Sequence, residues 1–372
     1  MFQSIRAIEF YSGIGGLHLA LSRSSVGDNA TVVRAFDWDQ LACAVYTANH
    51  GPGIAHRVDI TMLNADMLGP LNADLWLLSP ACQPYTVLNP NAKGAADPRA
   101  QSFLHLMEGI LPALAERGAA PTRLLIENVA GFEVSTTRTR VLDVLTKLGF
   151  TTDEFLLTPL QLGVPNSRLR YYLLASRASA ALITPMHSDR ILRHIPGRGM
   201  DWDWENACSL AAPETAENKV QPLRDYLDGH DALTAHAVPD RVLTKWGRLF
   251  DIVLPSAART CCFTRGYTQL VERTGSILQE NEELDTTVTF DKFLFAQASG
   301  DEQAVEILRP LRLRYFSPGE LLRLFCFEDV GSVGTFRWPV GISTKTKYRL
   351  IGNSVNVLVV TTLIEHLCRR PD

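Results

Sequence analysis

The fold is decided by one stretch, Leu78-Ser79-Pro80-Ala81-Cys82-Gln83-Pro84-Tyr85-Thr86, which follows the apolar run at residues 74–78. The run is too short and too rich in β-forming residues for a helix, so we expect a buried strand. Cys82 would then lie on a loop at the carboxyl end of that strand, where open α/β sheets bind ligands. Two prolines restrict the backbone around the thiol. This placement suits a nucleophile, although a lone cysteine is more often a buried structural residue.

The composition is that of a soluble globular protein. The chain has 372 residues, 46% hydrophobic and 20% charged, enough for one large domain or two smaller ones. No apolar run reaches the ~18 residues of a membrane span, and strand-like residues begin at Ile5, which leaves no room for a signal peptide. We therefore expect a protein of the cytoplasm or nucleus that is not secreted and does not bind membranes.

The seven cysteines are scattered, odd in number and without a C-x-x-C spacing. This pattern argues against a disulfide framework and against a zinc site, and it favours a reducing compartment. Charge is distributed unevenly around a formal net charge of −4: residues 201–231 hold eight acids and two bases, and residues 309–349 hold eight bases and three acids. Either a polyanion binds the basic face or both stretches are ordinary solvated surface; the counts fit both.

A glycine turn follows the first expected strand. Ile8-Glu9-Phe10 leads into Tyr11-Ser12-Gly13-Ile14-Gly15-Gly16 and then into a helical pattern at residues 17–21. Such a turn lets the backbone approach a nucleotide-like ligand closely, but it is a common motif and lacks the full G-x-G-x-x-G of dinucleotide sites. A second strand at residues 31–36 ends at Asp37, which could accept hydrogen bonds from a ribose. Trp38 beside it either covers an adenine or is a core aromatic residue.

Strands and helices alternate through the first half of the chain. We expect further strands at residues 57–60, 74–78, 124–129 and 154–157, the last leading into the stretch 161–174, and helices at 41–48, 100–116 and 139–148. This alternation predicts a parallel sheet with helices on both faces. The rhythm breaks near residue 185 and returns near 312, with helices expected at 318–325 and at the C-terminal end. We therefore expect a catalytic domain at 1–190, an irregular domain at 191–305 and a return to the first domain at 306–372.

Chemically active side chains end or flank the strands of this sheet. Cys82, Glu127 and the pair Arg168 and Arg170 would converge on one edge, beside the glycine turn. A thiol, a carboxyl group and two guanidinium groups next to a nucleoside pocket suit attack on a pyrimidine ring that must become electron-rich before it takes a methyl group.

The sequence resembles the cytosine-C5 methyltransferases over residues 5–370, with several motifs in the family's order. These are Tyr11-Ser12-Gly13-Ile14-Gly15-Gly16, Ser79-Pro80-Ala81-Cys82-Gln83-Pro84-Tyr85-Thr86, Glu127-Asn128-Val129, Arg168-Leu169-Arg170 and Gly352-Asn353-Ser354-Val355. Within the family it most resembles the small tRNA(Asp) cytosine-38 branch, through Cys262-Phe263-Thr264, Gly266-Tyr267 and Thr274-Gly275-Ser276. In one departure, Ala81 stands where the family usually has proline directly before the nucleophile.

The resemblance implies an α/β fold of the class I S-adenosylmethionine-dependent methyltransferases, with a Rossmann-like mixed sheet and a small irregular target-recognition domain. It implies that Cys82 attacks C6 of a flipped cytosine while Glu127 holds N3 and the exocyclic amine. Arg170 would contact the ring O2, and Arg168 would support the loop or a phosphate.

The resemblance also implies a cofactor site. S-adenosyl-L-methionine, which becomes S-adenosyl-L-homocysteine, would be bound by Tyr11, Ser12, Gly13, Ile14, Gly15, Gly16, Asp37, Trp38, Asp59, Ile60, Ser79, Asn353, Ser354 and Val355. RNA would be bound by Arg259, Cys262, Phe263, Thr264, Arg265 and Tyr267, with Arg273 nearby; the alternative is that this region is plain surface. Cys261 and Cys262 are adjacent and would strain a disulfide, so we interpret them as packing or RNA-contact residues.

Three other functions stay open. The same chemistry on DNA cannot be separated from the tRNA reaction by the active-site motifs, because both substrates present the same ring. A catalytically silent nucleic-acid-binding homologue would have no physical need for all four active-site residues. A nucleotide-dependent oxidoreductase is disfavoured by the short glycine motif. We expect a monomer that acts on tRNA, most of all tRNA-Asp, with DNA a weaker partner.

Overall fold

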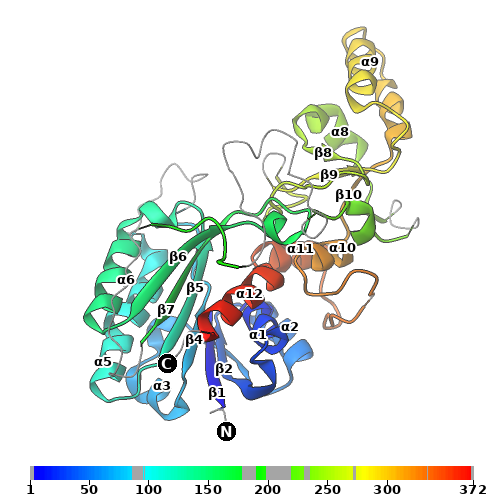
Figure 1. The fold of residues 1–372 in the computed structure, drawn as a ribbon. Helices are drawn as coiled ribbons and strands as arrows, with labels where there is room; N and C mark the ends of the chain where they lie inside the picture. Colours follow the sequence, from blue (N-terminus) through cyan, green and yellow to red (C-terminus); the bar gives the residue numbers. More distant parts are fainter. Residues whose placement is uncertain are drawn as a thin grey trace.

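The apolar runs of the sequence form the centre of a large sheet in the computed structural model, which describes residues 4–85, 95, 97–177, 190–197, 219–229, 235–270, 274–332 and 334–369. Within these ranges, seven strands pair in the order β3-β2-β1-β4-β5-β7-β6 (Figure 1). The strands are β1 (Ile5–Phe10), β2 (Ala30–Asp37), β3 (Ala55–Arg57), β4 (Leu75–Leu78), β5 (Arg123–Val129), β6 (Thr151–Leu157) and β7 (Arg170–Ser176).

The sheet is mixed, which confirms the family expectation and corrects the purely parallel sheet predicted from the strand–helix alternation. Strands β2, β1, β4 and β5 pair in parallel, but β7 lies antiparallel between β5 and β6. The link from β6 to β7 contains only a short 3-10 turn, Pro159–Leu162. Since a parallel neighbour requires a long crossover connection, this short link favours the antiparallel pairing.

Each face of the large sheet has its own apolar core, because successive side chains of a strand point to opposite faces. On β4, Leu75 and Leu77 belong to one core, and Trp76 and Leu78 to the other. The first core is covered by α1 (Gly16–Arg23), α2 (Gln40–His50) and α12 (Val357–Cys368). The second is covered by α3 (Ala65–Leu68), α4 (Gln101–Leu104), α5 (Leu111–Glu116) and α6 (Thr136–Lys147) (Figure 1).

Two expected elements differ in detail from the sequence prediction. The strand expected at residues 57–60 is β3, which ends earlier because Asp59 caps a 3-10 turn, accepting a hydrogen bond from the Thr61 amide at 3.0 Å. The helix expected at 100–116 is present, but its middle, His105–Ile110, is a π-helical segment between α4 and α5.

A second, smaller sheet lies beyond the carboxyl edge of the first (Figure 1). In the described part of the chain it contains β10, β9 and β8 in that order. Its core includes Val238, Phe290, Phe293 and Leu308. The elements of this region are β8 (Ile252–Val253), β9 (Ile277–Gln279), β10 (Leu313–Tyr315), α8 (Asp240–Trp246), α9 (Thr286–Ala298), α10 (Pro318–Leu324) and α11 (Thr344–Gly352). The domain limits at residues 190 and 305 stay a prediction.

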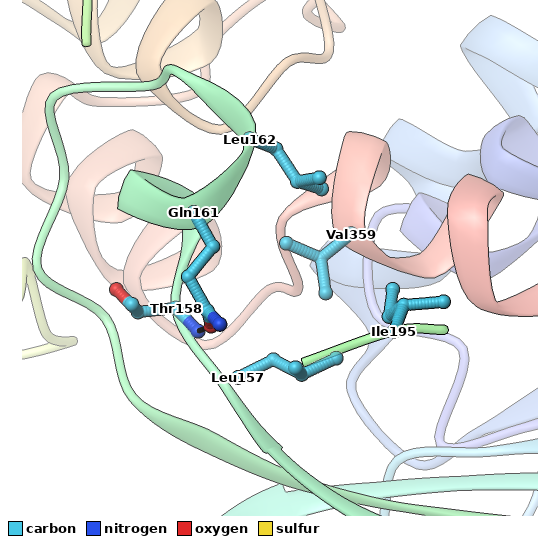
Figure 2. Close-up of a pocket in the computed structure, with 6 residues that line it drawn as sticks. All are labelled: Leu157, Thr158, Gln161, Leu162, Ile195 and Val359. Atoms are coloured by element: carbon cyan, nitrogen blue, oxygen red, sulfur yellow. Dashed lines mark hydrogen bonds between the residues drawn. The ribbon is translucent and has the colours of Figure 1, made fainter. Parts of the chain in front are cut away.

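Helix α12 is rich in apolar residues and follows shortly after α11. The stretch Thr344–Cys368 is long and apolar enough to cross a membrane by length and composition alone, yet 72% of its apolar window is buried inside the protein. A core helix passes the same test. Here α12 packs between α1 and the end of β6, and Figure 2 shows Val359 facing Leu157 and Leu162 across a cavity of about 10 Å³. That volume is about what one water molecule needs.

Candidate active site

The carboxyl ends of four parallel strands meet at one edge of the large sheet. Phe10 of β1 lies opposite Phe36 of β2 and Leu78 of β4, and Leu78 lies opposite Ile126 of β5. Strand β7 begins at the same edge because it runs the other way, with Arg170 opposite Val129. The register therefore brings together the Cys82 loop, Glu127, Arg170 and the glycine turn, as the strand ends predicted.

The Cys82 loop is tied to both neighbouring strands. The Ser79 hydroxyl donates to the Tyr11 carbonyl at 3.0 Å, which joins the loop to the glycine turn. The Asn128 side chain donates to the Pro80 carbonyl at 3.4 Å. This bond holds the backbone one residue before Ala81, so the loop has a support that does not depend on proline at that position. The last residue of the motif, Thr86, lies outside the described residues.

The Cys82 thiol is held in its neutral form. Burial raises the pKa of the thiol above its usual value, and the Glu127 carboxyl adds to this effect, while Arg170 and Arg265 oppose it. The thiolate, not the thiol, is the nucleophile. Loss of the thiol proton must therefore accompany the arrival of the substrate ring and the exclusion of water.

Glu127 lies beside a guanidinium group and still keeps a raised pKa. The Arg170 Nε atom is 3.4 Å from Glu127 Oε1, and both side chains are largely buried. Burial raises the pKa of Glu127 above its usual range despite the opposing effect of Arg170 and Arg168. A carboxyl group in this environment takes up a proton more readily than one in water, so it is able to donate a hydrogen bond to a ring nitrogen.

The two arginines of the pair have different positions. Arg168 is 3% exposed and donates to the carbonyl groups of Phe263 at 2.8 Å, Ser354 at 2.5 Å and Gly352 at 3.2 Å. It therefore ties the start of β7 to two distant segments, and its guanidinium group has no free path to a phosphate. Arg170, in contrast, lies beside Glu127 and contributes to the field at Cys82.

The glycine turn is fixed by Asp37. Its carboxylate accepts hydrogen bonds from the amides of Gly13 and Asp39, both at 2.8 Å. Trp38 is 74% exposed, which rules out its alternative as a core aromatic residue. Asp59 is also exposed, whereas Ile60 is buried.

The last motif packs directly onto the glycine turn. A methyl group placed on Gly16 would lie 3.0 Å from Ser354 Oγ and 2.8 Å from Val355 Cγ2, so only glycine fits there. On the other side of the turn, a methyl group on Gly13 would meet nothing within 4 Å. The buried Ser12 hydroxyl has no hydrogen-bond partner in the described part of the chain. The turn is thus closely packed behind and open in front, with an unpaired polar group beside the opening.

The expected RNA-binding residues divide into two groups, and two of them need correction. Phe263 and Tyr267 are 0% and 1% exposed, and the Tyr267 hydroxyl donates to the Ser276 carbonyl at 2.7 Å. The expectation that they contact RNA is wrong in this structure, because packing against other aromatic rings covers both side chains. Arg259 and Arg265 are exposed, and Arg259 pairs with Asp251 at 2.7 Å. Arg273 lies outside the described residues.

Cys262 lies between the two arginines rather than on the surface. Its sulfur is 3.5 Å from Arg168 Nη1 and 3.6 Å from Arg170 Nη2. These positive charges lower the pKa of the Cys262 thiol below its usual value, although burial acts in the opposite direction. The interpretation as a packing residue fits this position. In the described part of the chain, no group of acidic, histidine or cysteine residues could hold a metal ion.

Sequence reasoning missed two residues near the thiol. Asn128 was part of a motif, but its contact with Pro80 could not be read from the sequence. Arg99 binds Asp97 with hydrogen bonds of 2.9 and 2.6 Å, which raise the pKa of Arg99, and it is close enough to Cys82 for a weaker electrostatic effect. No sequence pattern marked it.

The basic stretch at residues 309–349 is mostly paired with acids. Within the described residues, five of its arginines form ion pairs with acidic residues: Arg309 with Asp240, Arg312 and Arg314 with Glu280, Arg323 with Asp228 and Arg349 with Asp39. Much of the positive charge in this stretch is therefore engaged in ion pairs within the protein.

Gly352 lies at a junction between the last motif and the backbone at Thr264 and Arg265, and a substitution there tests how closely the two segments pack. A methyl group there would lie 2.3–2.5 Å from backbone atoms of Thr264 and Arg265, which cannot rotate away. We expect Gly352→Ala to lower the free energy of unfolding by about 3 kcal/mol, as overpacking does. Gly229→Ala is the matched control, because nothing lies within 4 Å of its added methyl group. Urea denaturation of both variants checks this; equal midpoints would show that the junction has room.

Comparison with known proteins gives consistent matches over the whole chain. The family model described as C-5 cytosine-specific DNA methylase matches residues 5–369. The tRNA (cytosine(38)-C(5))-methyltransferase of Schizosaccharomyces pombe is 35% identical over 98% of this chain and 96% of its own length. The enzyme of the same name from Homo sapiens is 34% identical, with 98% and 99% covered. The crystal structure of the S. pombe Dnmt2 methyltransferase superimposes with a TM-score of 0.75 and 34% identity, covering 98% of each chain.

Proposed function

Because this chain belongs to the C-5 cytosine-specific DNA methylase family, we propose that it methylates C5 of cytosine 38 in the anticodon loop of tRNA, and of tRNA-Asp in particular. The observation that carries this proposal is the similarity, over nearly the full length of both chains, to enzymes named for that reaction. The meeting of Cys82, Glu127 and Arg170 at one edge of the sheet supports it.

S-adenosyl-L-methionine is the cofactor of this family and supplies the methyl group. The open side of Gly13 and the unpaired Ser12 hydroxyl fit such a ligand. We assign the ribose to Asp37 and the adenine to Trp38, Asp59 and Ile60. The backbone of Tyr11 and of the glycine turn (Ser12, Gly13, Ile14, Gly15, Gly16), with Ser79 beside it and Asn353, Ser354 and Val355 behind, would enclose the methionine part.

The covalent step begins with Cys82. The thiol proton passes to solvent water as the ring enters, and the thiolate adds to C6 of the cytosine, forming a C6–S bond and moving electron density toward C5 and N3. Protonated Glu127 donates to N3 as charge develops there, and Arg170 donates to O2. Once C5 carries the methyl group, its remaining proton leaves to a base. The C6–S bond then breaks, the thiolate departs, and the ring regains its aromatic character.

RNA contacts outside the pocket are assigned to the exposed residues of the recognition segment. Arg259 and Arg265 offer positive charge to phosphates, and Arg265 also acts on the field at Cys82. We also assign Thr264 and Cys262 to this surface; the Cys262 sulfur contacts both arginines of the pair. We propose that the protein acts as a monomer in the cytoplasm or nucleus.

Transfer of labelled methyl groups tests the substrate. We expect label in a tRNA-Asp transcript with cytosine at position 38, and none when that base is changed to uracil. Total tRNA and duplex DNA are assayed in parallel, and bisulfite sequencing locates the methyl group. Label in DNA alone would overturn the tRNA assignment. Label at another tRNA cytosine would overturn position 38.

A further inference from the structure

A row of four titratable side chains lies directly beneath the glycine turn. The Tyr46 hydroxyl is 3.1 Å from Glu9 Oε2 and 2.7 Å from His18 Nδ1. The His18 and His50 rings stack at 4.1 Å between centroids. Glu9 comes from β1 in the middle of the sheet, His18 from α1, and Tyr46 and His50 from α2, which lies on the same face (Figure 1).

The row ends at the backbone of the turn. A methyl group placed on Gly15 would lie 2.2 Å from His50 Nε2 and 3.1 Å from the Tyr46 ring. The His50 ring therefore packs against Gly15 with no space between them. Gly15 has a φ of 85°, a conformation that glycine adopts without strain, and its carbonyl accepts the Leu19 amide of α1 at 3.0 Å. Any movement of His50 would pass directly to the turn.

Glu9 lies at one end of this row and would carry a negative charge if it were ionised. Its side chain is fully buried in the sheet. Burial raises the pKa of Glu9 to about 8, although Tyr46 and the amides at the start of α1 oppose the change. Burial likewise lowers the pKa of His18 to about 3 and of His50 to about 4. All four groups are therefore neutral at pH 7.

The proton positions follow from counting donors. The Tyr46 hydroxyl has one proton, so it can donate to Glu9 or to His18 but not to both. When Glu9 is protonated, it is able to donate to Tyr46, which leaves the Tyr46 proton free for the neutral His18 ring. When Glu9 is ionised, Tyr46 must donate to the carboxylate. The Tyr46 oxygen and His18 Nδ1 then face each other as two acceptors unless the His18 ring changes its tautomer.

We propose that Glu9, Tyr46, His18 and His50 are positioning residues for S-adenosyl-L-methionine, which hold Gly15 from behind and do so fully only while Glu9 keeps its proton. The groups that face Glu9 are Tyr46 of α2, the amides of α1 and Asp37 of β2, whose negative charge also favours the protonated form of Glu9. The inference rests on the family's cofactor and not on the tRNA substrate.

The affinity for S-adenosyl-L-homocysteine, measured by calorimetry, tests the proposal apart from methyl transfer. For the unmodified protein we expect the Kd to rise about tenfold from pH 7 to pH 9, because the competent protonated fraction falls by that factor. At pH 8, binding should take up a fraction of a proton, seen as a difference between buffers with different heats of ionisation. A constant Kd over this range would overturn the proposal.

Glu9→Gln separates Glu9 from other groups that titrate in this range, including the amino group of the ligand. At pH 7 we expect this variant to bind S-adenosyl-L-homocysteine as the unmodified protein does. At higher pH it should show neither the tenfold rise in Kd that comes from Glu9 nor the proton uptake. Tyr46→Phe, which breaks the row, should weaken binding at least fivefold at pH 7, whereas Tyr226→Phe, a buried control in another part of the chain, should not. An unchanged pH profile in Glu9→Gln, or unchanged binding in Tyr46→Phe, would also overturn it.

A stability measurement checks that these variants fold. Glu9 is neutral when folded and ionised when unfolded between pH 4.5 and about 8, so the free energy of unfolding of the unmodified protein should fall as pH rises through this window. Glu9→Gln should show a flatter curve. If the two curves are parallel, Glu9 does not hold the proton and the proposal is wrong.

Discussion

Methyl transfer by Cys82→Ala is expected to fall by at least about a thousandfold, as losses of catalytic nucleophiles do. The affinity for S-adenosyl-L-homocysteine should stay within twofold, because the loop contacts at Ser79 and Pro80 use groups other than the thiol. Single-turnover rates on tRNA and calorimetric binding together measure both effects. Cys368→Ala is the matched control, since its thiol lies at the end of α12 and away from this edge.

The same variant tests the covalent adduct. In a tRNA with 5-fluorocytosine at position 38, fluorine replaces the hydrogen at C5. Fluorine cannot leave as a proton does, so the C6–S bond should persist. We expect a band on a denaturing gel that contains both protein and RNA, formed by the unmodified protein and by Cys368→Ala but not by Cys82→Ala. Turnover by Cys82→Ala at more than a tenth of the normal rate would contradict the assignment of the nucleophile.

The second large effect is on stability. Arg168→Leu should lower the free energy of unfolding by about 3–5 kcal/mol, because the buried carbonyl groups of Phe263, Gly352 and Ser354 would lose their donor. Arg168→Lys should recover part of the loss, since an ammonium group can reach fewer of these acceptors. Denaturation in urea gives both values.

An exposed arginine provides the comparison. Arg140 forms two hydrogen bonds with Glu108 on the surface of α6 and is about half exposed. Arg140→Leu should cost less than about 1 kcal/mol, as surface ion pairs do. If Arg168→Leu is no more destabilising than Arg140→Leu, the buried guanidinium group does not join the three segments.

The sequence predicted where the site lies better than how its residues are packed. Strand ends are visible as apolar runs followed by loop residues, so the meeting of Cys82, Glu127 and Arg170 at one edge could be inferred. The direction of β7 could not be inferred from alternation alone, because it depends on the short link that precedes it.

Burial was the main quantity that the sequence left open. The neighbouring arginines favour an RNA contact for Tyr267, and the resemblance implies one for Phe263, yet both are core residues. Arg168 and Arg170 are two positions apart, but Arg168 donates hydrogen bonds to backbone carbonyls, whereas Arg170 pairs with Glu127. Glu9 belongs to an apolar strand pattern, and only the structure shows that Tyr46 of α2 reaches its buried carboxyl group.

The contact between Gly16 and Val355 affects how the protein folds while it is being synthesised. The Thr361 hydroxyl also donates to the Ala20 carbonyl at 3.2 Å, so the first helix is completed by almost the last one. A chain still on the ribosome can form β1 and the glycine turn early, but it lacks the segment that closes them from behind. Until that segment emerges, apolar side chains of α1 such as Leu17 and Leu21 lack the part of their core that α12 supplies. We therefore expect the nascent protein to expose apolar surface until α12 is made, a state in which partly folded chains are prone to aggregate.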